Sequence, residues 1–442
     1  MQLIRSFAVA TVCLLAVHAR ARADELPPAS GDAPPPEYVD PSDPDGPGAS
    51  APGAAAPAET PAPSAESSEP PTGTVRAGAY ADSDKTTVIR TLGVLSHAWG
   101  PWSLSGSFGV DVVTSASVDV RSSPALSAVD VVTSASGRSS TSGGQMTDKR
   151  FQGTLGAGWK GSEGRAANVT GAVAKETDYT SVSGGINGSY DILDRNATLL
   201  AGVTVTDNWV ASVLDKSLNR KMLATGWSAG LARVLTRDDA IRIRYDGKLS
   251  TGYLASPYRS VRFGDWTAKL GDQQITFMNT IGSAAGLPER LPETRTSHAA
   301  VMEWLHSLAL GVAVHPEVRV SHDSFGINSA SASLELRVAR PTWRLQAGYR
   351  FYAQTGADFF QDKYTKDPSM YSYYTSDKEL GDQYGHLVGL DLSFVLVDAE
   401  NANDTRMLLN LQLNGSHYTY PGFTLLPSRD SVFASIGLSW EL

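Results

Sequence analysis

Long stretches of this chain alternate between apolar and polar residues with a period of two. Between residues 240 and 251, one parity carries apolar side chains and the other carries Arg242, Arg244, Asp246, Lys248 and Ser250. The same alternation recurs over residues 102–112, 197–206, 329–338, 343–354, 407–414 and 431–442. Because successive side chains of a β-strand point to opposite faces, these segments are predicted to be strands with one apolar and one polar face.

The length of these segments indicates where such strands lie. They extend over about ten residues or more, whereas strands of soluble proteins commonly have about 5–6 residues and a tilted strand needs about 9–11 to cross a bilayer. Lipid cannot satisfy an open sheet edge, so spanning strands must close into a barrel. We therefore predict an all-β fold, a transmembrane antiparallel up-and-down β-barrel of about 16 strands (range roughly 12–18) over residues 74–442.

The connections between the segments also alternate, in length. Short turns are expected near residues 100–101, 161–164, 193–195, 236–239 and 340–342, and long loops near 114–148, 208–223, 252–294, 355–382 and 417–429. Short turns at one end and long loops at the other are typical of outer-membrane barrels, with the turns in the periplasm. This pattern predicts a location in the bacterial outer membrane.

Composition excludes several other classes of protein. The mean hydropathy of −0.18 argues against a bundle of membrane helices. A single cysteine excludes a disulfide framework and a cysteine-based metal cluster. The net charge of −9 argues against nucleic-acid binding. We predict neither a cofactor nor a bound metal.

The first 73 residues differ from the rest of the chain. Arg5, an apolar stretch from Phe7 to Val17 and a small-residue site ending at Ala23 predict a secretory signal peptide over residues 1–23. Residues 24–73 are rich in proline, alanine and acidic residues, which predicts a disordered tether. Such a tether could span the periplasm or dock on a periplasmic partner, and the alternative is low complexity without a function.

Charged residues on the polar parity are candidates for lining the lumen. They are Arg150, Arg242, Arg244, Asp246, Lys248, Glu317, Arg319, Glu335, Arg337, Arg344 and Arg350, with further acidic residues at Asp111, Asp191 and Asp391. They predict either a water-filled lumen with an excess of positively charged side chains or a lumen closed by internal ion pairs. The number of strands decides between the two, because wide barrels leave a channel.

The segment 352–374 is rich in aromatic residues and carboxylates. The loop candidates Tyr352, Asp358, Phe359 and Phe360 belong to it. Exposed aromatic side chains beside carboxylates would suit a sugar, a protein partner or a cation. The alternative is a loop that packs on itself and caps the barrel.

A catalytic site at the barrel rim is a weaker hypothesis. His315 with Glu317, and His322 with Asp323, are the pairs that the sequence offers. A catalytic histidine needs its partner within hydrogen-bond distance, and spacing along a strand does not ensure this. We therefore predict that the protein is not an enzyme and has no catalytic residues.

Several phrases of the sequence resemble one bacterial family. They are DVVTSAS at Asp111–Ser117, ETDYTS at Glu176–Ser181, GYLASPY at Gly252–Tyr258, ERLPETR at Glu289–Arg295 and RFYAQTGADFF at Arg350–Phe360. Together, and in this order, they are similar to the family called domain of unknown function 3570, from about Tyr80 to Leu442. The resemblance implies an outer-membrane barrel, and it implies no activity and no catalytic residues.

Three functional hypotheses follow. The first is a passive pore for small hydrophilic solutes. The second is a non-conducting barrel that acts as a scaffold or binds a partner through its loops or tether, and the third is a hydrolase at the rim. As a membrane barrel, the protein is expected to contact outer-membrane lipid and the barrel-assembly machinery.

Overall fold

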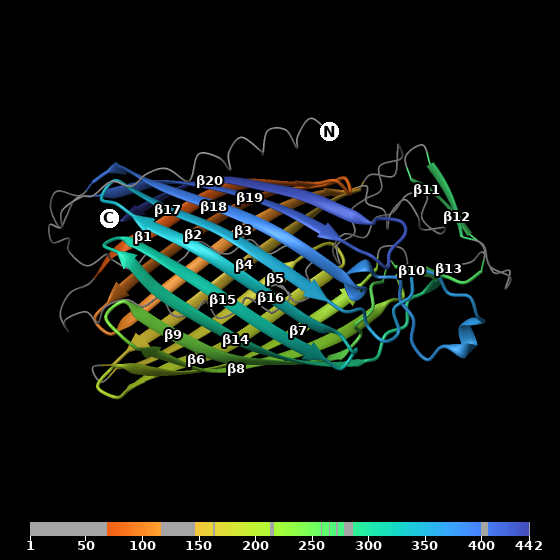
Figure 1. The fold of residues 1–442 in the computed structure, drawn as a ribbon, viewed down its shortest axis with the longest axis horizontal. Coiled ribbons are helices and arrows are strands. Elements are labelled where there is room, and N and C mark those ends of the chain that lie inside the picture. The colour runs from red at the N-terminus through yellow and green to blue at the C-terminus, as the bar shows by residue number, and fades with distance from the viewer. Residues whose placement is uncertain are drawn as a thin grey trace.

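The computed structural model describes residues 69–115, 146–161, 164–212, 216–257, 259–264, 266–270, 273–277, 286–398 and 405–441. In this part of the chain, sixteen antiparallel strands form one closed barrel (Figure 1). They are β1 (Glu69–Asp82), β2 (Thr86–Trp99), β3 (Trp102–Ser115), β4 (Met146–Lys160), β5 (Arg165–Lys175), β6 (Tyr179–Ile192), β7 (Ala197–Ala211), β8 (Asn219–Val234), β9 (Asp239–Gly252), β14 (Thr294–Ala309), β15 (Val312–Asp323), β16 (Asn328–Ala339), β17 (Trp343–Gln354), β18 (Gln383–Val397), β19 (Arg406–Thr419) and β20 (Ser428–Glu441). The predicted fold class and strand number are confirmed.

The barrel closes where the first strand meets the last. β1 pairs with β2 on one side and with β20 on the other, and Thr72 to Asp82 lie opposite Glu441 to Ser431. β1 begins at Glu69, inside the segment that the sequence assigned to the tether. Closure explains the difference, because β20 needs a partner strand along its whole length. The predicted signal peptide and the tether up to residue 68 lie outside the described residues.

The two ends of the barrel differ in their connections, although the end expected to carry long loops also has three short ones, at residues 83–85, 176–178 and 324–327. Short turns join β2 to β3, β4 to β5, β6 to β7, β8 to β9, β14 to β15 and β16 to β17, and we call this the turn end. At the opposite, loop end, the chain between β9 and β14 forms two small two-stranded sheets, which lie beyond the barrel in Figure 1. One pairs β10 (Ser260–Arg262) with β13 (Gly286–Pro288), and the other pairs β11 (Trp266–Leu270) with β12 (Gln273–Phe277).

Alternation along each strand separates an apolar outer face from a polar inner face. Most of the large exposed hydrophobic residues share one parity on each strand, as Ile243 and Tyr245 do on β9. A row of aromatic side chains lies on this outer parity near the turn end, and consists of Trp99, Trp102, Trp159, Tyr190, Trp304, Trp343, Phe394 and Trp440. Aromatic side chains at this level are typical of a membrane–water interface.

The helical content is small. Two 3₁₀ helices, η1 (Pro368–Met370) and η2 (Lys378–Leu380), lie in the loop between β17 and β18. Among the described residues, no helix is long and apolar enough to cross a membrane.

Candidate functional site

The lumen face of the barrel carries the charged residues that the sequence singled out. The cross-strand register places all eleven on the inner parity: Arg150 on β4, Arg242, Arg244, Asp246 and Lys248 on β9, Glu317 and Arg319 on β15, Glu335 and Arg337 on β16, and Arg344 and Arg350 on β17. Ten of them lie on four strands, β9 and β15–β17, which together with β14 form one continuous sector of the wall.

A chain of polar contacts crosses this sector. Arg242 donates from Nε to Oε2 of Glu303 on β14, at 3.0 Å. The same oxygen lies 3.4 Å from Nε2 of His315 on β15. His315 Nδ1 in turn lies 3.1 Å from Nη2 of Arg337, which is paired with Glu335 on the same strand. Four neighbouring strands are thereby linked through their inner side chains.

The contact with Arg337 defines the tautomer of His315. A guanidinium can only donate hydrogen bonds, so His315 Nδ1 must act as the acceptor. The proton of the neutral imidazole is then on Nε2, which faces the Glu303 carboxylate. His315 is therefore held as a hydrogen-bond bridge between an acidic and a basic side chain.

A second group of charges spans three strands. Asp246 Oδ2 on β9 accepts hydrogen bonds from Arg244 Nε and from Nη1 of Arg319 on β15, both at 3.2 Å. β14 runs between them, and its inner residues there, Ala299 and Val301, are buried. These short side chains leave room for Arg319 to reach across to the aspartate.

Other inner charges lie apart from these groups. The Arg350 guanidinium carbon lies 5.9 Å from the centre of the Tyr352 ring. Arg150 pairs with Glu176 at 3.4 Å, and Arg90 on β2 pairs with Asp111 at 2.8 Å. Of the described residues, no basic side chain forms an ion pair with Glu317, and no acidic side chain forms one with Arg350.

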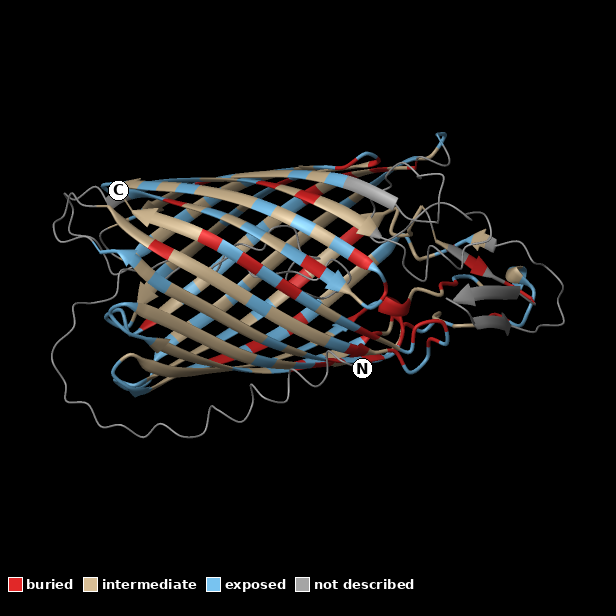
Figure 2. Ribbon diagram, turned by 90° about the horizontal axis from the view of Figure 1, so that it is seen from above, coloured by how far each residue is buried: buried red, intermediate tan, exposed pale blue. Residues whose placement is uncertain are grey.

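At the loop end, several loops pack into one folded unit, which we call the cap. The cap consists of residues 253–257, 259–264 and 286–293 before β14, the turn 324–327, the loop 355–382 and the loop 420–427. Three clusters of buried hydrophobic residues hold it together. Figure 2 shows buried residues gathered where these loops meet the barrel.

The loop 355–382 is anchored on inner side chains of the barrel. Gln354 Nε2 donates to the carbonyl oxygens of Glu379 and Gly381, both at 2.8 Å. Tyr352 donates to Gln354 Oε1 at 2.5 Å and packs with Tyr418 of β19 in the first cluster. Because these anchors face inward, the loop folds over the lumen side of the rim.

Buried charges connect the parts of the cap. Arg259 pairs with Asp377 and lies 3.7 Å from Glu289, which also accepts from the Thr375 hydroxyl at 2.8 Å and from the backbone nitrogen of Ser256. Glu379 contacts Lys378 at 3.2 Å and Arg429 of β20 at 3.9 Å. Burial alone would raise the pKa of the Glu379 carboxyl, but these cations and a hydrogen bond with Asp377 outweigh it and hold that pKa well below its ordinary value.

The loop candidates take different positions in the cap. Tyr352 is buried. Phe359 is partly buried against the third hydrophobic cluster of the cap, and Phe360 is partly buried against the first and third clusters. Asp358 is exposed, and its carboxylate lies over Gly326, whose positive φ of 90° suits a glycine. Three of the four side chains therefore help to pack the cap.

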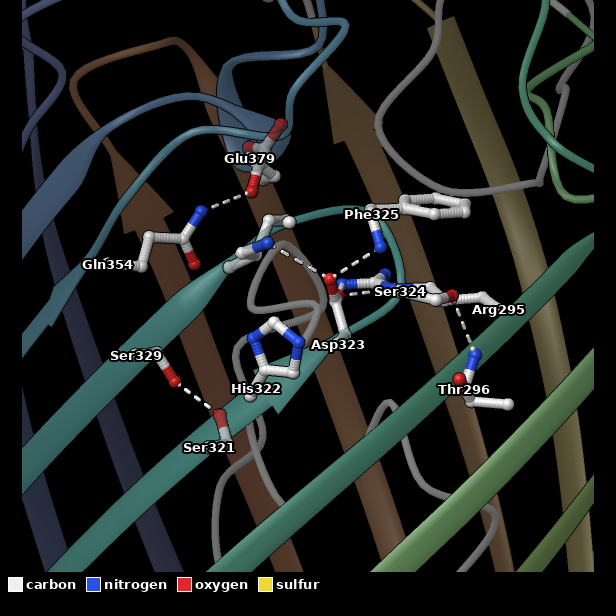
Figure 3. A network of polar contacts seen from close by, with 12 residues as sticks. Arg295, Thr296, Ser321, His322, Asp323, Ser324, Phe325, Ser329, Gln354 and Glu379 are labelled. Carbon is white, nitrogen blue, oxygen red and sulfur yellow. Dashed lines mark hydrogen bonds and ion pairs between the residues drawn. The ribbon is translucent and has the colours of Figure 1, made fainter.

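The two histidine–carboxylate pairs expected at the rim do not form. His322 lies on the outer face, bonded to Asn328 at 2.9 Å, whereas Asp323 is buried on the inner side. Figure 3 shows Asp323 accepting from Arg295 and from the backbone nitrogen of Phe325. His315 contacts Glu303 rather than Glu317. Among the described residues, no group of three or more His, Cys, Asp or Glu side chains is placed to hold a metal ion.

Comparison with known families supplies a classification for this barrel. The family model described as "Protein of unknown function (DUF3570)" matches residues 48–226 and 219–439. The chain belongs to the DUF3570 family. The predicted resemblance is confirmed.

Three solved proteins illustrate the structural similarity of the DUF3570 barrel to known folds. A bacterial polysaccharide outer membrane secretin has 8% identity, a TM-score of 0.44 and coverage of 84% of this chain and 98% of its own. The monoaromatic hydrocarbon channel CymD has 10% identity, a TM-score of 0.35 and coverage of 85% of this chain and 89% of its own. OpdO of Pseudomonas aeruginosa has 8% identity, a TM-score of 0.37 and coverage of 85% of this chain and 97% of its own. Among curated proteins, no sequence matches the chain significantly.

Sequence reasoning missed two parts of the DUF3570 site. Glu303, which joins Arg242 to His315, was not among the candidates. The buried charges of the cap, Arg259, Asp377 and Glu379, were not singled out either. Glu303 lies on the inner parity of β14 two residues from Val301, so the alternation there is weak.

Proposed function

We propose that this DUF3570 protein is an integral outer-membrane barrel that serves as a passive channel for small hydrophilic solutes. The observation that carries the proposal is a closed barrel of sixteen strands whose inner face is polar within the described residues. Barrels of eight strands are filled by their own side chains, whereas barrels of 16–18 strands leave an aqueous channel.

The outer surface supports a membrane location. Its exposed hydrophobic residues and the aromatic row at the turn end match the lipid-facing band and interfacial girdle of outer-membrane barrels. In this location the short turns face the periplasm and the cap faces outward. Contacts with outer-membrane lipid and with the barrel-assembly machinery, and a periplasmic partner for the acidic tether, belong to the same proposal.

The second candidate function is a non-conducting barrel that presents its cap to a partner. The interlocked cap favours this candidate, because three hydrophobic clusters and a buried charge network fix its loops on the rim. A rigid cap provides a defined binding surface, and it also narrows the mouth of the lumen.

Conductance across a planar lipid bilayer separates the two candidates. Folding is first verified on a gel, on which the folded protein migrates differently from the heated protein. The folded protein is then added to one side of the bilayer in KCl. Stepwise increases in current support the channel. A protein that inserts with the folded migration and produces no steps contradicts the channel and supports the non-conducting barrel.

A further inference from the structure

The lumen wall contains two adjoining arcs of different chemistry, which together take in nine of the sixteen strands. On β5–β8, which the structure describes throughout, the inward charged residues are Asp191 near the turn end and Arg220 near the loop end. Between these levels the inner positions are occupied by small or neutral residues: Asn168, Thr170, Ala172, Ala174, Ser181, Ser183, Gly185, Asn187, Ser189, Thr198, Leu200, Gly202, Thr204, Thr206, Asn208, Met222, Ala224, Gly226, Ser228, Gly230 and Ala232. We call this sector the neutral arc.

Hydroxyl groups cover two of the glycines of the neutral arc, Gly185 and Gly202. A Cβ atom at Gly185 would lie 3.1 Å from the hydroxyl oxygens of both Thr170 and Thr204. A Cβ atom at Gly202 would lie 3.1 Å from the Ser228 hydroxyl. The side chains of neighbouring strands therefore lean over the glycines, and the surface they form presents hydroxyl donors and acceptors without formal charge.

The adjoining sector, β9 and β14–β17, is the charged arc. Its inner cations are Arg242, Arg244, Lys248, Arg295, Arg319, Arg337, Arg344 and Arg350, and its inner acids are Asp246, Glu303, Glu317, Asp323 and Glu335, with Arg295 and Asp323 paired with each other. Asp246 is shared by two arginines, and Glu303 contacts Arg242 and His315. Cations therefore outnumber the acids that could neutralise them.

Arg350 is the cation of this arc best placed to meet a solute. In register it lies between Ser333 of β16 and Leu387 of β18, neither of which carries charge. Its guanidinium lies over the Tyr352 ring, and within the described residues no carboxylate forms an ion pair with it. A guanidinium in this position offers paired N–H donors, which suit a carboxylate, sulfate or phosphate group.

We propose that the solutes of this channel are small polyhydroxylated anions, such as sugar acids. The inference rests on the proposed channel function. The charged arc raises the local concentration of anions and lowers that of cations. The neutral arc exchanges hydrogen bonds with solute hydroxyls and has no fixed charge that would retain the anion.

The reversal potential in a KCl gradient tests the charge preference. The channel is expected to pass chloride more readily than potassium. In 1 M salt the Debye length is about 3 Å, so the ratio of chloride to potassium permeability is expected to approach that of free diffusion. Arg350→Gln should reduce the ratio by up to about tenfold, because in water one unit charge about 6 Å away changes the local concentrations of chloride and potassium by about threefold each, in opposite directions. Arg350→Lys should preserve it.

A matched control separates the lumen charge from total charge. Arg233 lies exposed on the outer face of β8, so Arg233→Gln makes the same change in net charge outside the lumen. The ratio of chloride to potassium permeability in Arg233→Gln should equal that of the unmodified protein. If Arg233→Gln and Arg350→Gln change the ratio equally, the assignment to Arg350 is wrong.

Solute flux into proteoliposomes tests the solute class. Glucuronate, glucose and glucosamine have similar size and differ in charge, and glucuronate is expected to enter fastest and to be slowed most by Arg350→Gln. Preference for potassium, or fastest entry of glucosamine, would overturn the proposed solute class while leaving the channel intact. Absence of any conductance would instead remove the channel itself, and the solute class with it.

Discussion

The Nε2 atom of His315 lies 3.4 Å from a carboxylate oxygen of Glu303 on the neighbouring strand of the barrel wall. The same oxygen accepts from Arg242 on the next strand, so Glu303 is the acceptor that two basic side chains share. Glu303 is buried, whereas its partners are partly exposed to the lumen. It therefore joins β9, β14 and β15 on their inner face.

Replacing Glu303 by glutamine should destabilise the barrel. The change removes the negative charge between Arg242 and His315 while keeping the size of the side chain. Leaving a partly buried guanidinium without its carboxylate costs about 1–3 kcal/mol in the free energy of unfolding. Urea unfolding of the protein in lipid vesicles, followed by tryptophan fluorescence, measures the loss.

Glu317→Gln is the control for this prediction. Glu317 lies opposite Glu303 in the register, and within the described residues it forms no ion pair. Its replacement should change the free energy of unfolding by less than about 0.5 kcal/mol. Equal losses in the two variants would show that Glu303 has no special part in stability.

Gly247 should resist substitution because a tryptophan covers it. A Cβ atom at Gly247 would lie 2.2 Å from the Trp227 ring, whereas one at Gly93 of β2 has a carbonyl oxygen at 3.9 Å as its nearest neighbour. Gly247→Ala must displace the ring and should cost about 1–3 kcal/mol. Gly93→Ala should be neutral. The temperature at which the folded gel band disappears compares the two variants, and equal temperatures would contradict the close packing of Trp227.

The cap should loosen in acid because of Glu379. A carboxyl whose pKa is lowered by folding stabilises the folded form above its ordinary pKa of about 4.3, and this contribution is lost as the pH falls toward the lowered value. Pepsin cleavage within residues 355–382 should therefore accelerate as the pH is reduced from about 5 to 2, while the barrel keeps its folded gel migration.

Glu379→Gln tests the origin of that acid response. The variant lacks the titrating group, so its cap should already be more open to protease at pH 5 and should change less on acidification than the unmodified cap. A variant whose cleavage shows the same dependence on pH as the unmodified protein would show that another group controls the cap.

The sequence alone predicted the strands of the barrel correctly where the outer face of a strand is uniformly apolar. On β9, Ile241 and Ile243 face outward and Arg242 and Arg244 face inward, as the alternation indicates. β14 is less regular, because His298 lies on its outer face and the apolar Ala299 and Val301 lie on its inner face. This mixture concealed Glu303 although it shares the inner parity.

The cap depends on contacts that local patterns do not encode. Arg259 and Asp377 are far apart in the chain and meet because the loops before β14 and after β17 emerge at the same end of the barrel. The turn and loop lengths indicated which end carries the loops, but pairing between loops is set by the closed strand order. The start of β1 at Glu69 was also missed. The composition of that segment resembles the tether, and its strand conformation depends on pairing with β20, at the other end of the sequence.

The most direct test of the membrane-barrel account is the labelling of neighbouring cysteines on opposite faces. The only cysteine of the sequence is Cys13, in the predicted signal peptide, so Ile243→Cys and Arg244→Cys provide single reporters on β9. With folded protein in lipid vesicles, a hydrophilic maleimide should label Arg244→Cys from the lumen and should spare Ile243→Cys in the lipid, and both should react after denaturation. Equal labelling of the two folded variants, or labelling of Ile243→Cys alone, would contradict the account.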